Sequence, residues 1–339
     1  MKKLLLIILL IINTNLFSQV KKQIDSLEIL LKNTKKDVVK IKIIEQLGEL
    51  TYDSDSVKFN YYKKQLKKLS YKLKSDLGFV KLYIFEGADH YIHGRTNKSI
   101  LSFKKALFFS KKAKSDVAMA TCYNNIAGME SVNSNYKIAI SNYMESLKIH
   151  EKRKDLKEQF SSLRSIIDLY IVLEDFTNVE KYIHKALPLL PNSKNGISAI
   201  FRFYQNLGTF YRFKGNYELS IEYLKKSINL VKVNYQGLNE NQNGFAYVEM
   251  ALTYLKVKDY KNAKLYLDKC SIISKQDPGF SLLSYYNQAL TQYYLETKDF
   301  QKAKEANSIA RINFEKFSNE KGVLVSYQNG EKIAIAQKN

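Results

Sequence analysis

The feature that most constrains this chain is a repeat of about 40 residues, which runs through most of its 339 residues. An aromatic residue follows a polar turn at five places, with spacings of 40 to 43 residues: Tyr136, Phe176, Tyr217, Tyr260 and Phe300. Counting back from Tyr136, Thr96 and about Val57 hold the same position. A fixed period of this size is typical of proteins that stack one supersecondary unit many times.

Each repeat carries two helical stripes. In the clearest unit, Tyr204, Leu207, Gly208 and Tyr211 have the spacing of one helix face. The turn Lys214-Gly215-Asn216-Tyr217 follows, where Gly and Asn can adopt positive φ, and then a second stripe begins. We expect small residues such as Gly208, Ser220 and Ser227 to let the two helices approach closely. We expect Tyr204, Tyr211 and Tyr217 to fill the space between units.

The pattern predicts an all-α fold, a right-handed α-α superhelix of about seven helix pairs with a C-terminal capping helix. The expected repeats are 40–75, 78–114, 118–154, 158–194, 199–235, 244–276 and 281–317, with the cap at 322–338. The residues that we assign to the repeat framework are Gly87, Ala106, Ala127, Tyr136, Ala139, Phe176, Ala186, Pro191, Tyr204, Gly208, Tyr211, Tyr217, Tyr254, Tyr260, Ala263, Phe300 and Ala303.

The first 18 residues are typical of a secretory signal peptide. Lys2 and Lys3 precede an aliphatic run at 4–12, and a polar segment with small residues follows. A run of nine apolar residues is too short for a membrane span, which needs about 20. We therefore expect export to the periplasm or secretion, with residues 19–339 forming the solenoid. No later apolar run approaches the length of a span, so we expect a protein that is not membrane-embedded.

The chain has two cysteines and a net charge of +21. Two cysteines in this length exclude a disulfide-stapled miniprotein and a cysteine-rich zinc domain. Cys122 and Cys270 are far apart in sequence, and we expect both to be buried apolar residues and not a disulfide. The positive charge suggests nucleic-acid binding. However, lysine is spread over nearly every expected helix, and an exported protein would not meet DNA. We therefore predict no nucleic-acid partner.

The repeat resembles the tetratricopeptide repeat family, in a variant with longer helices. Tyr204, Leu207, Gly208, Tyr211 and the turn ending at Tyr217 are the best copy of its pattern. The ordinary member has 34 residues per repeat, so about six extra residues imply helices that are longer by nearly a turn each. The resemblance covers roughly residues 40–315. A neighbouring type of α-solenoid is the alternative.

The resemblance implies that the first helix of each pair lines a concave groove. It places groove residues three before, one after and five after the Gly208 position, and two more six before and four after it. The candidate partner-binding residues are Asn124, Arg164, Asp168, Arg202, Gln205, Arg212, Gln288 and Gln292. Arginine can hold a carboxylate in a two-pronged pair, so an acidic or carboxylate-ended peptide is the sharper reading. Solvated or mutually paired side chains are the alternative.

Catalysis and metal binding find little support in the sequence. Asp89, His90 and His93 form the only histidine cluster, and a metal would need a further ligand from elsewhere. Zincin, nucleophile-elbow, P-loop and dinucleotide-binding motifs are all missing. We predict no enzyme, no metal and no cofactor.

We therefore expect an exported, non-catalytic scaffold that binds a peptide or protein partner in its groove. The alternative is a periplasmic sensory input module of a signal-transduction protein, of the histidine kinase or helix-turn-helix regulator type. Such a module would be separated from its membrane and output parts.

Overall fold

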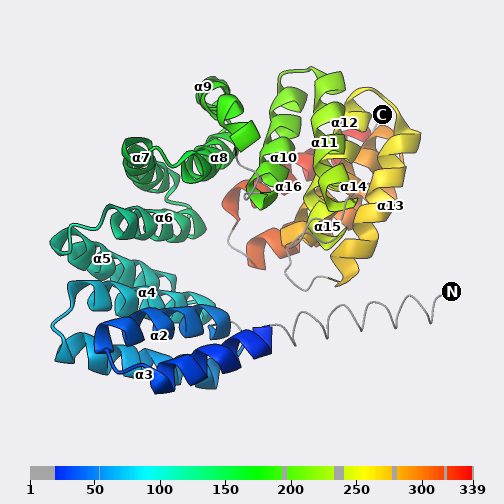
Figure 1. Ribbon diagram of the computed structural model, residues 1–339. Coiled ribbons are helices and arrows are strands. Elements are labelled where there is room, and N and C mark those ends of the chain that lie inside the picture. The colour runs from blue at the N-terminus through cyan, green and yellow to red at the C-terminus, as the bar shows by residue number, and fades with distance from the viewer. Residues whose placement is uncertain are drawn as a thin grey trace. The chain divides into compact units, whose positions relative to one another are not determined.

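The computed structural model describes residues 20–52, 54–192, 197–232, 240–276, 281–316 and 319–337. These residues form helices joined by short turns, with no β-strand among them, and the predicted all-α solenoid is confirmed (Figure 1). The predicted signal peptide lies outside the described residues. The chain divides into two compact units, one ending at Asp155 and one beginning at Leu156.

The first unit holds three antiparallel helix pairs, preceded by a helix over residues 20–33. The pairs are α2 (Asp37–Thr51) with α3 (Ser56–Lys72), α4 (Asp76–Ile92) with α5 (Thr96–Lys112), and α6 (Asp116–Val132) with α7 (Tyr136–Arg153). Consecutive pairs pack against each other, α3 on α4 and α5 on α6.

The second unit continues the same pattern. Its pairs are α8 (Leu156–Val172) with α9 (Phe176–Ala186), α10 (Ile197–Phe213) with α11 (Tyr217–Lys232), α12 (Gly244–Lys256) with α13 (Tyr260–Gln276), and α14 (Ser281–Glu296) with α15 (Phe300–Lys316). Two 3-10 helices, η1 (Leu187–Asn192) and η2 (Glu240–Asn243), lie between pairs, and α16 (Glu320–Ala336) packs on α15. In the described residues, seven pairs and a final helix agree with the predicted number.

The helix at 20–33 was not predicted from the sequence, where the repeats were expected to begin near residue 40. Its Ile24 is buried in a cluster with Ile44 and Leu47. Glu28 accepts hydrogen bonds from Tyr62 Oη and from Lys58 Nζ, the latter at 2.9 Å. These bonds lower the pKa of Glu28. The signal was present in the helical spacing of Val20, Ile24, Leu27 and Leu31, all of which contribute to that cluster.

The turns between helices share one backbone conformation. A residue with positive φ ends a helix at Lys74, Gly94, Lys114, Ser134, Lys154, Glu174, Gly215, Lys258 and Lys298. After it, an N–H returns to a carbonyl five residues earlier, as from Asn216 to Tyr211 O at 2.9 Å. Gly215 confirms the predicted positive φ, but Asn216 does not adopt it. Its side chain instead accepts a hydrogen bond from Leu219 N and caps the next helix.

Small residues bring the helices of a pair together, as predicted. A Cβ atom added to Gly208 would lie 2.5 Å from Leu224 Cγ on the second helix. One position on the second helix also donates to a backbone carbonyl of the first helix 26 residues earlier. Ser146 bonds to Ala120 O at 3.2 Å and Ser227 to Phe201 O at 3.1 Å. The thiol of Cys270 occupies the same position, 3.6 Å from Gly244 O.

Two of the three tyrosines that we expected to fill the space between repeats, Tyr204 and Tyr211, instead contact Tyr223 within their own pair. Tyr211 of α10 stacks on Tyr223 of α11, inside one pair, with centroids 5.5 Å apart. The pairs Tyr170–Tyr182 and Tyr254–Tyr266 repeat this stack at the same separation of 12 residues. Among the described residues, ring contacts between successive repeats all include a phenylalanine, as in Phe176 with Phe213 at 4.7 Å and Tyr71 with Phe79 at 5.0 Å. The spacing of a stripe fixes the face of its helix, but it does not identify the neighbour on that face.

The two cysteines are buried and free, as predicted. Burial raises the pKa of the Cys122 thiol to about 11 and that of Cys270 to about 12. Both thiols therefore stay protonated near neutral pH and act as small apolar side chains.

Candidate functional site

A hollow of about 480 Å³ opens in the first unit, along the helices that come first in each pair. Its lining comes mainly from α2, α4 and α6, with Phe59 and Phe103 reaching in from the second helices. We call this hollow the first-helix groove. The resemblance noted in the sequence implies a groove on these first helices.

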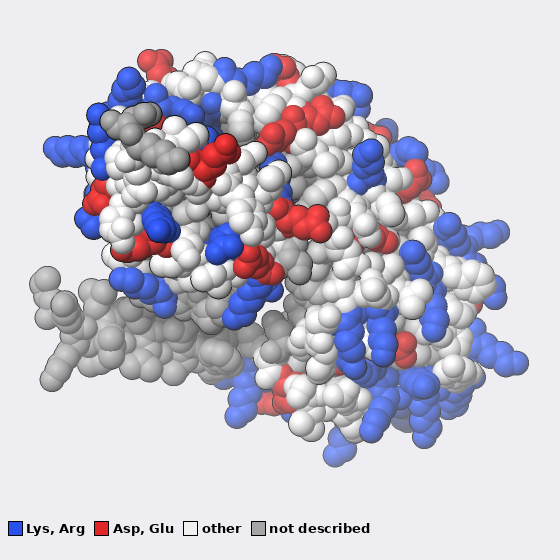
Figure 2. All heavy atoms as spheres, turned by 180° about the vertical axis from the view of Figure 1, so that it is seen from behind, with Lys and Arg blue, Asp and Glu red and all other residues white. Residues whose placement is uncertain are grey.

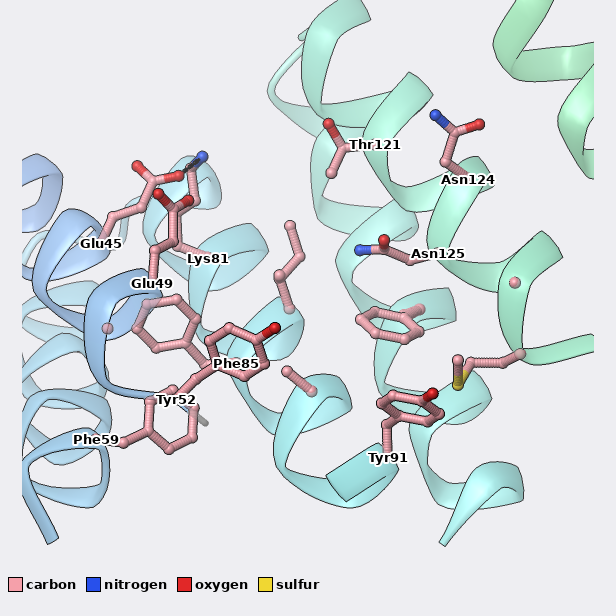
Figure 3. A pocket seen from close by; sticks show the side chains of 16 residues that line it. Glu45, Glu49, Tyr52, Phe59, Lys81, Phe85, Tyr91, Thr121, Asn124 and Asn125 are labelled. Carbon is pink, nitrogen blue, oxygen red and sulfur yellow. Dashed lines mark hydrogen bonds and ion pairs between the residues drawn. The ribbon is translucent and has the colours of Figure 1, made fainter. Parts of the chain in front are cut away.

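The first-helix groove combines three kinds of side chain (Figure 3). Glu45, Glu49 and Lys81 lie on one side, and Thr121, Asn124 and Asn125 of α6 lie on the other. The aromatic rings of the lining are Tyr52, Phe59, Phe85, Tyr91 and Phe103. Lys81 forms an ion pair with Glu45, which leaves the exposed Glu49 as the surplus charge of this end. The groove therefore offers aromatic surface, amide groups and a negative charge.

Asn124 was predicted as a groove residue, and the structure places it in this lining. Its Oδ1 atom is shielded from solvent and accepts no hydrogen bond from the described residues. A buried acceptor without a donor costs free energy, and a ligand N–H group that reached it would remove that cost.

Several lining residues were missed by the sequence analysis. Glu45, Glu49 and Tyr52 lie three before, one after and four after Gly48. Lys81 and Tyr91 lie six before and four after Gly87. All of these offsets belong to the set that the resemblance implies for groove residues, and Asn124 was selected by one of them, three residues before the Gly208 position of its repeat. The first two repeats match the pattern least well, and the predicted groove residues begin only at Asn124.

The other predicted groove residues belong to the second unit, where two of the arginines are already paired. Arg164 forms an ion pair with Asp168 on the same helix, and its Nη2 donates to Ser165 Oγ at 2.9 Å. Arg212 Nε on α10 donates to Glu249 Oε2 on α12 at 2.9 Å. Arg212 also lies over the Phe213 ring, 4.4 Å from its centroid.

Arg202 differs from the other two arginines. It is exposed on α10 and forms no ion pair with a described residue. Gln205 lies one turn further along, half-buried, and its Nε2 has no hydrogen-bond partner there. Gln288 and Gln292 are half-buried on α14. The three arginines therefore do not present a joint anion site, because Arg164 and Arg212 already face carboxylates of the chain itself.

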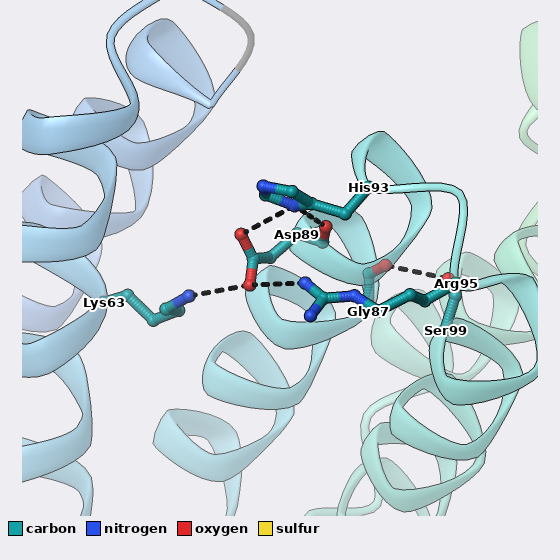
Figure 4. Close-up of polar contacts among 6 residues, drawn as sticks. All are labelled: Lys63, Gly87, Asp89, His93, Arg95 and Ser99. Carbon is teal, nitrogen blue, oxygen red and sulfur yellow. Dashed lines mark hydrogen bonds and ion pairs between the residues drawn. The ribbon is translucent and has the colours of Figure 1, made fainter.

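The Asp89 cluster is an ion-pair hub (Figure 4). The Asp89 carboxylate lies 3.1 Å from Lys63 Nζ, 3.5 Å from His93 Nδ1 and 3.8 Å from Arg95 Nη2. His90, on the same helix, has its pKa lowered by burial and by Arg95. The carboxylate thus links α3, α4 and the turn before α5.

Two negative findings concern the described part of the chain. No group of three or more His, Cys, Asp or Glu residues there is arranged to hold a metal ion. None of the helices described is both long enough and apolar enough to cross a membrane.

Comparison with known proteins agrees with the repeat pattern. The tetratricopeptide repeat family model matches residues 201–230 and 246–276. These two segments of the chain therefore carry tetratricopeptide repeats, which confirms the resemblance seen there in the sequence. A search of curated proteins finds no match.

Solved structures share the fold at low sequence identity. The apo form of RapI matches with a TM-score of 0.61 and 12% identity, over 96% of each chain. The apo form of the quorum sensor NprR from B. thuringiensis matches with a TM-score of 0.55 and 18% identity, over 94% of this chain and 99% of that one. NprR in complex with its cognate peptide NprX matches with a TM-score of 0.59 and 17% identity, over 86% and 82%. At these identities the comparison establishes the fold alone.

Proposed function

We propose that this chain is a non-catalytic scaffold that holds an extended peptide, or an extended segment of a protein, in the first-helix groove. The observation that carries the proposal is Asn124, whose unpartnered Oδ1 lies in the groove lining beside Asn125. An extended backbone has N–H and C=O groups at regular intervals, and side-chain amides satisfy both kinds. The complex of NprR with a peptide gives the same fold a precedent for this kind of ligand.

The lining also indicates which peptide the groove would prefer. Aromatic rings would hold an apolar side chain, and Glu49 would attract a lysine, an arginine or a free amino terminus. A peptide that carries an aromatic and a cationic residue fits both features. A preformed groove would lose little conformational entropy on binding.

The test uses the full chain and a random peptide library displayed on phage. Enriched peptides are synthesised, and their Kd values for the wild type and variants are compared by calorimetry. We expect Asn124→Ala to weaken binding by about tenfold, the equivalent of one lost hydrogen bond in a desolvated site. Asn60→Ala, exposed on α3 outside the groove, is the control and should change nothing. Equal Kd values for the wild type and Asn124→Ala would refute the assignment to this groove.

An acidic or carboxylate-ended peptide would be bound in the second unit, through Arg202 on α10. Its support is that Arg202 is exposed and has no anionic partner among the described residues. The discriminating variant is Arg202→Glu alone, because Arg212 also joins two helices. Library peptides rich in Asp and Glu that lose affinity for Arg202→Glu, but keep it for Asn124→Ala, would move the site to the second unit.

A sensory role is the second candidate, and we propose it as an alternative use of the same groove. Its support is that one protein with this fold, NprR, is described as a quorum sensor. A sensor must change its state when the peptide binds. Hydrogen exchange of the full chain, with and without an enriched peptide, separates the two roles. Protection confined to the groove helices favours a scaffold, and altered exchange in α8–α16 favours a sensor.

We also propose that the protein is exported, on the basis of the pattern in residues 1–18. The test expresses the full gene in a bacterial host and sequences the N-terminus of the protein from the periplasm or medium. An N-terminus at Gln19 supports the proposal. An intact Met1 in the cytoplasm, unchanged when Ile8 is replaced by Lys, would contradict it.

A further inference from the structure

Charge is divided unequally between the two helices of each pair in the first unit. The first helices, α2, α4 and α6, hold eight acidic residues against three lysines. Of the second helices, α3 and α5 hold eleven lysines and no acidic residue. A compositional preference for lysine would not sort the charges by helix face. The division therefore indicates that the positively charged side of α3 and α5 is a binding surface.

The exposed lysines of α3 and α5 lie on matching parts of the two helices, and Lys64 and Lys72 recur after 40 residues as Lys104 and Lys112. They fall at the spacing of a single helix face, and we call them the lysine strip: Lys64, Lys67, Lys68, Lys72, Lys98, Lys104, Lys105, Lys111 and Lys112. Lys72 is paired with Asp37, and the other eight have no anionic partner among the described residues. Lys and Arg side chains crowd together over this end of the molecule (Figure 2).

Exposed apolar side chains lie between these lysines. The exposed fraction is 57% for Tyr61, 58% for Tyr71, 60% for Leu101 and 56% for Phe108. Each lies one helical turn from a lysine of the strip, so the same face offers positive charge and apolar surface. The second helices of the other unit also carry acidic residues, for example two glutamates beside the three lysines of α11 and Asp268 among the four lysines of α13.

We propose that the lysine strip docks the protein on the surface of an anionic lipid bilayer. Each lysine near such a surface gains about 1 kcal/mol, and the gain falls off within a Debye length. Leu101 and Phe108 would enter the interfacial region, where apolar side chains add a contribution that salt does not screen. The first-helix groove lies on the opposite helices of the same pairs, so it would remain open to a peptide.

A nucleic acid is the rival partner, and the strip fits it less well. It contains no arginine, the residue best suited to two-pronged contacts with phosphate and guanine. Aliphatic side chains such as Leu101 gain little from a phosphate backbone, whereas they gain from the bilayer interface.

The experiment measures co-sedimentation of the full chain with vesicles of phosphatidylcholine alone or mixed with phosphatidylglycerol, over a range of salt concentrations. One variant carries Lys64→Gln, Lys68→Gln, Lys104→Gln and Lys105→Gln. The matched control removes the same charge from exposed lysines of α13 and α15, as Lys261→Gln, Lys269→Gln, Lys275→Gln and Lys304→Gln. Both variants keep residues 1–18, so any binding through that apolar segment is common to them.

We expect the wild type and the control to bind the anionic vesicles, with binding that weakens as salt increases. The strip variant should lose about tenfold or more in partition coefficient and most of the salt dependence. Leu101→Ser should weaken binding and leave the salt dependence unchanged. Equal loss in both quadruple variants, or tight binding to duplex DNA without binding to vesicles, would overturn the proposal.

Discussion

Arg212 on α10 donates a hydrogen bond from Nε to Glu249 Oε2 on α12, and this ion pair joins the first helices of two successive repeats. Its two side chains are 12% and 20% exposed. The pattern that marks Arg212 as a groove residue says nothing of this partner. A residue chosen for binding therefore also contributes to the stack.

Removal of one member of this pair should destabilise the protein. Loss of a partner leaves a charge in a place with little water, which typically costs about 3–5 kcal/mol when burial is complete. We expect about 2–4 kcal/mol for Arg212→Ala, measured by urea unfolding followed by circular dichroism. Lys226→Ala is the control, because its pair with Glu222 is 46% and 52% exposed and should contribute less than about 1 kcal/mol. Equal shifts for the two variants would show that the buried pair is dispensable.

Gly208→Ala should destabilise the second unit. The new Cβ would lie 2.5 Å from Leu224 Cγ, so the two helices would have to separate at a cost of about 1–3 kcal/mol. Gly128→Ala is the matched control, since its nearest atom, Tyr143 Oη, is 3.9 Å away. There the better helix propensity of alanine should stabilise by up to about 1 kcal/mol. Thermal unfolding measures both, and stabilisation by Gly208→Ala would contradict the close approach.

Lys258→Gly should stabilise the protein. Lys258 has a φ of 59°, a region that is unfavourable for a residue with a Cβ atom. Gly215 has the same role in the preceding repeat, with a φ of 78° and no atom near its missing Cβ. We expect a gain of about 0.5–1 kcal/mol for Lys258→Gly and a similar loss for Gly215→Ala. Two thermal shifts of the same sign would be inconsistent with this account of the turn.

Acid should weaken the helix caps. Asp259 accepts from the backbone N–H and the side chain of Asn262, and both bonds hold its pKa below the usual 3.8. A carboxylate whose pKa falls on folding stabilises the protein above its unfolded pKa. That contribution disappears as the pH drops through the lower, folded value.

The same sign applies to Asp175 and Asp299, whose pKa values are lowered by contacts with Asn178 and Lys302. We therefore expect stability to fall from about pH 4 downward. Asp259→Asn keeps a capping side chain but cannot titrate. Its difference from the wild type in urea midpoint should be present at neutral pH and vanish at the acid end. A pH-independent difference would show that titration of Asp259 is not the cause.

Much of the lining of the first-helix groove follows from the repeat pattern of the sequence. The three first helices share one repeat position, so residues at the same offset from it lie on the same face. The offset that selects Asn124, three residues before that position, also leads to Glu45 and Ile84 in the lining. The same set of groove offsets, counted from that position in each of the three helices, leads to most of the remaining lining. The pair of Arg164 with Asp168 is local, four residues apart on one helix, and agrees with the alternative of mutually paired side chains. The ion pair of Arg212 was beyond the pattern, because Glu249 stands in another repeat.

The sequence by itself determined that this protein is a stack of paired helices, because apolar spacing and turn residues are local and recur every 40 residues or so. It also places eleven lysines and no acidic residue on α3 and α5. Only the tertiary structure decided which tyrosines meet inside a pair, that Arg212 is paired with Glu249 and which amide remains without a partner. Those outcomes depend on contacts between side chains distant in sequence, whose geometry exists only once the helices have packed.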